Sequence, residues 1–248
     1  MSTVHTQSPK PHQLQQPFSA VLFDLDGTLI DTAPDFIRIV KLMCADANTT
    51  APADHLIRAQ VSEGARAMVN LIHPELEANS PELLRIRQQF LDIYAQNIAV
   101  DTCLFEQMDG VLKKLEAQNI PWGIVTNKPR LLSELLLAAL DLTKRCHVLV
   151  CPEDVKHTKP DPEPMYLAAK QLNIAPEQIV YVGDHPRDID AGRAAGMPTI
   201  LAAYGYLPPA HCADLNAWQA DYIIDTVAQL GQLLAQNTQH AAVEQMLT

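Results

Sequence analysis

An apolar run that ends in two aspartates constrains the fold more than any other feature of this chain. Residues 20–29 read AVLFDLDGTL. A short β-rich run that ends in Asp and Gly predicts a buried strand that opens into a turn. Side chains two positions apart in an extended chain point the same way, so Asp24 and Asp26 would share one small volume. Two carboxylates this close require a cation between them or a proton on one of them, which indicates a metal site with acid/base capability. A turn rich in Asp and Gly is the simpler alternative.

From about residue 108, strand-like and helix-like segments alternate. Strands are expected at 122–125, 147–150, 179–182, 199–202 and 222–224, and helices at 111–118, 131–140, 163–172, 189–195 and 226–235. Strands that alternate with helices of this size predict an α/β fold with a mainly parallel, Rossmann-like sheet that is covered on both faces.

The stretch from residue 31 to residue 104 is helical in pattern and lacks strong strand signals. Helices are expected from Asp31 onward, with Pro34 near the first turn, and at 54–61, 65–72 and 81–97. The last of these carries apolar residues at helical spacing: Leu83, Leu84, Ile86, Phe90, Leu91 and Tyr94. The stretch begins just after the aspartate pair, at the carboxyl end of a strand, where open α/β sheets bind ligands. An inserted helical module there can close over a site and exclude water.

These patterns predict a catalytic core interrupted by a cap. The expected α/β core comprises residues 18–30 and 105–235, the helical cap residues 31–104, a disordered tail residues 1–17, and a weakly helical C-terminal tail residues 236–248.

Composition narrows the classes of partner. The net charge of −11 argues against a general electrostatic grip on nucleic acid or anionic lipid. The five cysteines are odd in number, widely spaced and form no CxxC, so reduced thiols are expected, with no disulfide framework and no zinc site. No segment approaches the roughly 20 apolar residues of a membrane span, and residues 1–17 lack a signal-peptide core. A soluble, cytoplasmic protein is expected, and the sequence carries no signal for its oligomeric state.

Polar side chains follow three further predicted elements of the sheet. Thr126 and Asn127 come after one strand and offer a hydroxyl and an amide to a phosphate oxygen, although both are also ordinary turn residues. Lys159 stands in a proline-rich loop that would fix the approach of its stem, or it is simply solvated. Asp184 follows a buried strand and could complete a shell of oxygen ligands, whereas Asp188 could be no more than the N-cap of a helix beginning at residue 189.

Taken in order, these four groups resemble the motifs of the haloacid dehalogenase superfamily of phosphotransferases, which use an aspartate nucleophile. The DxDGT motif matches residues 24–28, the Ser/Thr motif Thr126, the Lys motif Lys159 and the GDxxxD motif residues 183–188, over about residues 18–235. The helical insertion resembles the cap of the phosphoglycolate phosphatase-like branch. His185-Pro186 departs from the small polar residue that many relatives carry after the aspartate.

The resemblance implies a role for each motif residue. Asp24 would be the nucleophile that forms an aspartyl phosphate, and Asp26 the acid/base group. Thr126 and Lys159 would hold the non-bridging phosphate oxygens. Mg²⁺ would lie between Asp24, the backbone carbonyl of Asp26 and Asp184, with Asp188 orienting Lys159 or a metal-bound water. The implied partner is a small-molecule phosphate ester.

The choice of ester should depend on the cap, because the core only binds phosphate. Arg66, in a Gly-containing turn before a helix, is either a carboxylate-binding side chain or a surface arginine. Several stretches resemble the N-acetylmuramic acid 6-phosphate phosphatases of bacterial cell-wall recycling: residues 31–36, 62–68, 122–129, 148–152, 159–164 and 183–185. This ester is expected. A phosphoglycolate phosphatase, a sugar-phosphate mutase and, from another class, a phosphate-accepting receiver are the alternatives.

Overall fold

A six-stranded parallel sheet forms the centre of the fold, with strand order β5-β4-β1-β6-β7-β8. The strands are β1 (Ala20–Phe23), β4 (Trp122–Val125), β5 (Val148–Val150), β6 (Ile179–Gly183), β7 (Thr199–Ala202) and β8 (Tyr222–Ile224). β1 lies inside the sheet, between β4 and β6. The computed structural model describes residue 14 and residues 17–235, and over this part of the chain the expected Rossmann-like α/β fold is confirmed.

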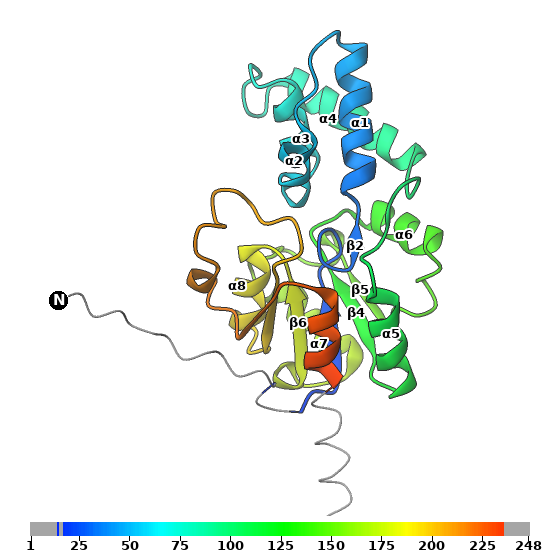
Figure 1. Cartoon of the computed structure of the whole chain (residues 1–248), viewed down its shortest axis with the longest axis vertical. Coiled ribbons are helices and arrows are strands. Elements are labelled where there is room, and N and C mark those ends of the chain that lie inside the picture. Colours follow the sequence, from blue (N-terminus) through cyan, green and yellow to red (C-terminus); the bar gives the residue numbers. More distant parts are fainter. Residues whose placement is uncertain (1–13, 15–16, 236–248) are drawn as a thin grey trace, which may run out of the picture.

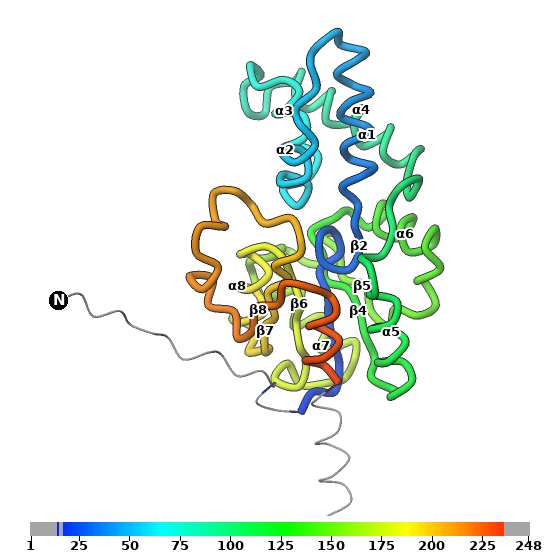
Figure 2. The backbone as a smooth tube through the Cα atoms, in the orientation of Figure 1, coloured from blue at the N-terminus to red at the C-terminus, as the bar shows by residue number. Residues whose placement is uncertain are grey.

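Helices cover both faces of the sheet (Figures 1 and 2). Alternate residues of β1 explain why: Val21 and Phe23 pack into one core, Ala20 and Leu22 into the other, and all are fully buried. The first core also takes side chains from α5 (Met108–Ala117), α6 (Arg130–Ala139) and helical residues 227–235. The second takes them from α7 (Glu163–Leu172) and α8 (Pro186–Ala194). Short 3₁₀ turns lie at η2 (Pro152–Asp154), η3 (Pro176–Gln178) and η4 (Leu215–Trp218).

A helical module lies beyond the carboxyl ends of the strands (Figure 1). It contains α1 (Ala33–Asp46), α2 (Asp54–Arg58), η1 (Val61–Glu63), α3 (Ala65–Ile72) and α4 (Pro81–Gln96). Its core is mostly its own, and the Phe36 ring packs against Tyr94 and Phe90 with centroids 4.7 and 5.5 Å apart. Local signals fix the helix starts: Ser80 is the N-cap of α4, and its hydroxyl accepts a hydrogen bond from the Leu83 amide at 3.2 Å.

Two short strands connect the module to the sheet. β2 (Ile30–Asp31) carries the chain out, and β3 (Cys103–Leu104) brings it back in antiparallel pairing. The fully buried Asp35 fastens the two passages together, because its carboxylate accepts hydrogen bonds from the Asp101 amide at 3.0 Å and the Thr102 hydroxyl at 2.6 Å. Burial opposes ionisation of Asp35, but these bonds and one from Arg38 hold its pKa below the ordinary value.

The turn after β1 is tightly packed against the end of β6. Gly27 has a φ of 85°, and a Cβ at this position would lie 2.2 Å from Asp184 Oδ2. Glycine is therefore required here both by the backbone conformation and by the close approach. This turn brings the first aspartate motif next to Asp184.

One expectation is wrong at α8. The helix begins at Pro186, not at residue 189, because the His185 side chain accepts a hydrogen bond from the Arg187 amide and caps the first turn. Asp188 therefore lies inside the first turn, where its carboxylate accepts a bond from the His185 amide at 3.1 Å. It is fully buried and is not the N-cap.

Other expectations have simpler outcomes. The second cap helix is shorter than expected and is followed by η1. All five cysteines are free thiols. No helix in the described part of the chain combines the length and apolar character that crossing a bilayer requires. The expected tails at 1–17 and 236–248 lie outside the described residues, apart from residues 14 and 17.

Candidate active site

Lys159 lies at the centre of a buried polar network. Its ammonium group is 2.8 Å from Asp24 Oδ1 and 2.7 Å from Asp188 Oδ1, and it also donates to the Val125 carbonyl at 2.8 Å. The Tyr181 hydroxyl lies 2.8 Å from the same nitrogen and completes its surroundings. The Lys159 side chain is fully buried, so the solvated alternative is wrong. Lys159 lies behind Asp24, on the side away from the cavity between the core and the helical module.

Three carboxylates converge beside this lysine. Asp24, Asp184 and Asp188 are buried, and each offers an oxygen within 4.8 Å of the others. Thr28 donates to Asp184 Oδ1 at 3.0 Å and the Tyr206 amide donates to Oδ2 at 2.7 Å, which fixes the carboxyl in place. Burial and the charges of Asp24 and Asp188 raise the pKa of Asp184 well above its ordinary value.

This cluster fits a divalent cation. The three buried acids lie beside Lys159 and near Arg187, and a bound cation would offset the mutual repulsion of these carboxylates, which water screens poorly. A donor set made only of carboxylate oxygens suits a hard cation such as Mg²⁺, Mn²⁺ or Ca²⁺. The carboxylates of Asp24, Asp184 and Asp188 are close enough to one another to hold a single ion.

Asp24 is a carboxylate anion at the floor of a cavity. Burial opposes its ionisation, but the charges of Lys159 and Arg187 hold its pKa below the ordinary value. Because it also lines the cavity, the carboxylate is available to a ligand. A buried, ionised carboxylate that faces an open cavity can act as a nucleophile.

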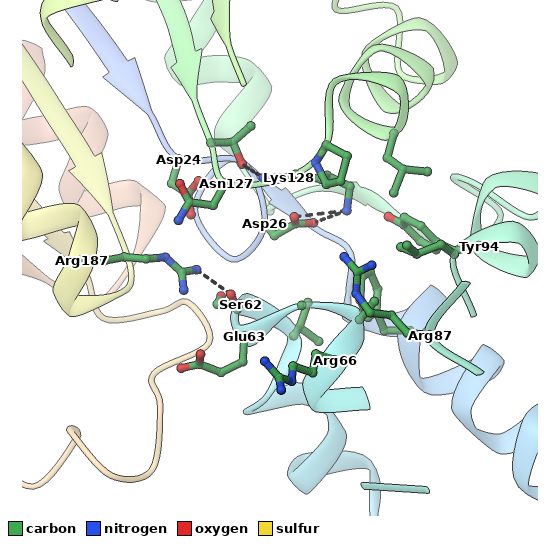
Figure 3. A pocket seen from close by; sticks show the side chains of 18 residues that line it. Asp24, Asp26, Ser62, Glu63, Arg66, Arg87, Tyr94, Asn127, Lys128 and Arg187 are labelled. Carbon is green, nitrogen blue, oxygen red and sulfur yellow. Dashed lines mark hydrogen bonds and ion pairs between the residues drawn. The ribbon is translucent and has the colours of Figure 1, made fainter. Parts of the chain in front are cut away.

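Asp26 has different partners, although it is only two residues away. Lys128 Nζ lies 3.1 and 3.2 Å from its two oxygens, and the Thr32 hydroxyl donates to Oδ1 at 2.6 Å. The Lys128 ammonium lies over the rings of Tyr94 and Phe36, 4.6 and 5.2 Å from their centroids. The core and the helical module therefore hold Asp26 jointly (Figure 3).

Thr126 and Asn127 line the cavity and also support its other groups. The Thr126 hydroxyl accepts a hydrogen bond from the Lys128 amide at 3.1 Å. The Asn127 amide donates to the Lys159 carbonyl at 3.0 Å, which ties two of the predicted motifs together. Both side chains remain within reach of a ligand in the cavity.

The η1 turn of the helical module contacts the loop after β6. Arg187 donates to the Ser62 carbonyl at 2.5 Å, and Glu63 lies 2.9 Å from His185 Nε2. His185, the residue that departs from the family pattern, thus joins the two parts of the molecule. Burial and the Arg187 charge lower the pKa of His185, while Glu63 opposes the shift.

A cavity of about 260 Å³ lies between the core and the helical module. Its walls are formed by Asp24, Asp26, Phe36, Val61, Ser62, Glu63, Gly64, Ala65, Arg66, Arg87, Leu91, Tyr94, Thr126, Asn127, Lys128, Pro129, Leu132 and Arg187. Figure 3 shows Asp24 and Asp26 on the core side, and Arg66 and Arg87 on the side of the module. The volume is close to the lower end of the about 300–1,000 Å³ typical of sites for small organic ligands.

The structure brings most of the predicted residues together. Thr126, Asn127 and both aspartates of the first motif line the cavity, and Lys159, Asp184 and Asp188 lie directly behind Asp24. Arg66 lies on the cavity wall, where it is largely exposed and donates to Asn79 at 2.9 Å.

The sequence reasoning missed Lys128, Arg187, Arg87 and Tyr94. The first two lie inside the motif stretches already singled out, so their position was a usable signal. The other two lie on a helix whose pattern indicated only packing.

Comparisons with known proteins agree with this geometry. Residues 21–202 match the family model described as haloacid dehalogenase-like hydrolase. The chain belongs to the haloacid dehalogenase-like hydrolase family. It is 45% identical over 216 residues to a Pseudomonas putida protein named N-acetylmuramic acid 6-phosphate phosphatase, with 87% of this chain and 95% of the relative covered. It is 40% identical to a Xanthomonas campestris phosphoglycolate phosphatase, over 85% of this chain and 94% of that one.

A solved structure has the same fold. The crystal structure of a predicted phosphoglycolate phosphatase from Haemophilus somnus superposes with a TM-score of 0.76 at 26% identity, covering 87% of this chain and 97% of that one. The resemblance inferred from the four motifs is therefore confirmed, and the chain is a hydrolase of this family.

Proposed function

We propose that this chain is a cytoplasmic, Mg²⁺-dependent phosphatase that hydrolyses N-acetylmuramic acid 6-phosphate through an aspartyl-phosphate intermediate. The observation that carries the proposal is that the two aspartates of the first motif have different partners beside one cavity. Asp24 is an anion braced by a buried lysine, and Asp26 is held by Lys128 beside the same cavity. The relatives named above, all phosphatases by name, support the reaction class.

The residues divide the work of two phosphoryl transfers. An Asp24 oxygen attacks phosphorus, the ester P–O bond breaks, and the leaving alkoxide takes a proton from Asp26. Asp26 then removes a proton from water, whose oxygen attacks phosphorus and breaks the bond to Asp24. The Thr126 hydroxyl and the Asn127 amide bind non-bridging oxygens at the cavity floor, and Lys159 neutralises Asp24 and the phosphoryl group it carries. Asp24, Asp184 and the Asp26 carbonyl would hold Mg²⁺, which would supply further charge neutralisation.

The substrate follows from the cavity and from the relatives. A monosaccharide phosphate suits a cavity of about 260 Å³, whereas phosphoglycolate, a two-carbon acid, leaves much of it to water. Residues 31–104 act as the cap that encloses the leaving group, with Arg66 at its outer edge offering a charge to the substrate carboxylate. Phosphoglycolate remains the second candidate because several relatives carry that name.

Phosphate release with Mg²⁺ tests the proposal. N-acetylmuramic acid 6-phosphate should give the highest kcat/KM, ahead of phosphoglycolate, and Asp24→Asn should lose about 10⁴-fold or more of the activity. Asp92→Asn, which changes an exposed aspartate of α4, should have no effect and is the matched control.

A mutase would form an isomer without releasing phosphate. A receiver would retain a phosphoryl group and release none from esters. Either result would replace the proposed function.

A further inference from the structure

One face of α4 lines the cavity. Arg87, Leu91 and Tyr94 are spaced four and three residues apart, so they project from the same side of the helix, and all three lie on the cavity wall. Leu83, Ile86 and Phe90 pack within the core of the helical module, and the Tyr94 ring belongs both to that core and to the cavity wall. The apolar pattern of this helix therefore conceals a second, ligand-facing stripe.

The Tyr94 hydroxyl lacks a partner. The side chain is fully buried, yet its oxygen makes no hydrogen bond to any described residue. Burial and the charges of Asp26 and Asp35 raise the pKa of Tyr94 well above its ordinary value, so the hydroxyl stays protonated and can donate. A buried, unsatisfied hydroxyl on a cavity wall is a site for a ligand oxygen.

Arg87 is a cation without a counter-charge. It is half-buried, and Figure 3 shows its side chain directed from α4 into the cavity. Within residues 17–235, no acid or hydrogen-bond acceptor is paired with it. The other cations on the wall are engaged: Lys128 with Asp26, Arg187 with the Ser62 carbonyl, and Arg66 with Asn79.

Arg87 and Tyr94 occupy different positions along α4 relative to the acid/base group. Tyr94 is the one nearer the acid/base group, because its ring lies under the ammonium that contacts Asp26. Arg87 lies seven residues earlier, which is about 10 Å along the helix axis at about 1.5 Å per residue. Backbone positions this far apart leave room between them for a hexose ring with a charged substituent, whereas a two-carbon acid is shorter than this rise.

We propose that Arg87 and Tyr94 are specificity-determining residues that read the leaving group of a sugar phosphate. Arg87 pairs with the carboxylate of the substituent, Tyr94 donates a hydrogen bond to an oxygen of the sugar, and Leu91 contacts the apolar surface between them. The inference rests on the proposed function and adds to it a named recognition surface on α4. The main carboxylate contact then belongs to Arg87, with Arg66 in an outer position.

Steady-state kinetics on two matched sugars tests the assignment. N-acetylglucosamine 6-phosphate lacks only the lactyl group of N-acetylmuramic acid 6-phosphate, and therefore its carboxylate. Arg87→Ala should lower kcat/KM for the muramic ester by about 10- to 100-fold, mostly through KM, and lower that for the glucosamine ester only a few-fold. Tyr94→Phe should lower both by about 3- to 10-fold, because the sugar is common to both.

Two variants on exposed side chains serve as controls. Arg85→Ala changes a neighbouring α4 arginine that pairs with Glu82 at 2.8 Å outside the cavity, and Tyr166→Phe removes an exposed hydroxyl from α7. Both should retain wild-type kinetics. For every variant, a far-UV circular dichroism spectrum and a Tm equal to those of the wild type show that the fold is intact.

The outcomes separate the inference from the proposed function. If the wild-type protein does not hydrolyse the muramic ester, the proposed function fails before any variant is examined. If the wild type is active but Arg87→Ala affects both sugars equally, or if only Arg66→Ala discriminates between them, the assignment of Arg87 is overturned and the proposed function stands.

Discussion

At the scale of single residues, the two aspartates of the first motif differ in the lysine that each one contacts. Asp24 contacts Lys159, which is fully buried, whereas Asp26 contacts Lys128 at the edge of the cavity. The chain turns at Gly27, with its positive φ, directly after Asp26. Like charges two residues apart can therefore coexist, since each is neutralised separately, and this allows the nucleophile and the acid/base group to be different side chains.

Lys128→Met tests whether Lys128 positions Asp26. Methionine keeps the length of the side chain and its contacts with the aromatic rings but removes the charge. We expect kcat/KM for an alkyl phosphate to fall by up to about 10²-fold, within the 10²–10⁴ that acid/base catalysis contributes. For p-nitrophenyl phosphate the fall should be much smaller, because its leaving group needs no proton. Equal losses on both esters would show that Lys128 binds phosphate instead.

The sequence predicted the motif residues better than their surroundings. Asp24, Thr126, Lys159 and Asp184 each follow a buried strand or lie in a stiff loop, and parallel strands bring such positions to one edge of the sheet. Lys128 lies inside a motif stretch but was not recognised, because a lysine in a turn is usually solvated and only the tertiary fold places its ammonium over two rings of the helical module.

At the scale of elements, the connection between the sheet and the helical module depends on Asp35. Its carboxylate joins the first turn of α1 to the chain that returns at residues 101–102, through three hydrogen bonds from that segment. Arg38 reaches from the same helix to Asp35 and Asp101. This single residue therefore holds together both passages into the module.

Asp35→Asn should lower the free energy of unfolding by about 1–3 kcal/mol at pH 7, because an amide places donors where the carboxylate accepts bonds. The folded-state pKa of Asp35 is lowered, so its contribution is complete above the unfolded value of about 3.9 and disappears as the pH falls through the folded value. Urea unfolding at pH 7, 5, 4 and 3 should show the difference between wild type and variant narrowing below about pH 4. A difference that does not change with pH would contradict the role of the charge.

The elements themselves were largely predictable where local chemistry decides them. Residues 65–72 and 163–172 are helical as predicted, since apolar spacing and prolines or glycines at their starts specify them. The start of α8 was missed because the capping residue is a histidine, which is not among the usual N-caps. In α4, Leu84 is exposed and Leu91 faces the cavity. Their positions were not predicted, because helical spacing alone does not reveal which apolar residues face the core.

At the scale of the whole molecule, the cavity exists only because the helical module meets the core. Contacts between the two parts, such as Glu63 with His185 and Arg187 with the Ser62 carbonyl, depend on side chains more than 100 residues apart in the chain. The alternation of strands and helices predicted the sheet and the insertion point, but no local pattern specifies how the module sits over the sheet. That Arg87 and Tyr94 line the cavity therefore became recognisable only in the folded chain.

The acidic cluster behind the cavity should couple the stability of the whole molecule to Mg²⁺. A cation that binds the folded chain alone stabilises it by about 2.7 kcal/mol at 100 times its Kd, which raises Tm by roughly 5–10 °C for a chain of this size. Without metal, the raised pKa of Asp184 means that its ionised form destabilises the fold at pH 7. Asp184→Asn removes that charge, so the metal-free variant should melt at or above the wild-type Tm.

With saturating Mg²⁺ the wild type should have the higher Tm. The Asp184→Asn variant has lost a metal ligand, so Mg²⁺ should raise its Tm only slightly. Thermal unfolding after chelation and dialysis, with and without MgCl₂, measures both Tm values, and NaCl at matched ionic strength controls for charge screening. An equal rise in wild type and variant would place the cation elsewhere. A wild-type Tm that does not respond to Mg²⁺ would show that the acidic cluster does not bind the cation.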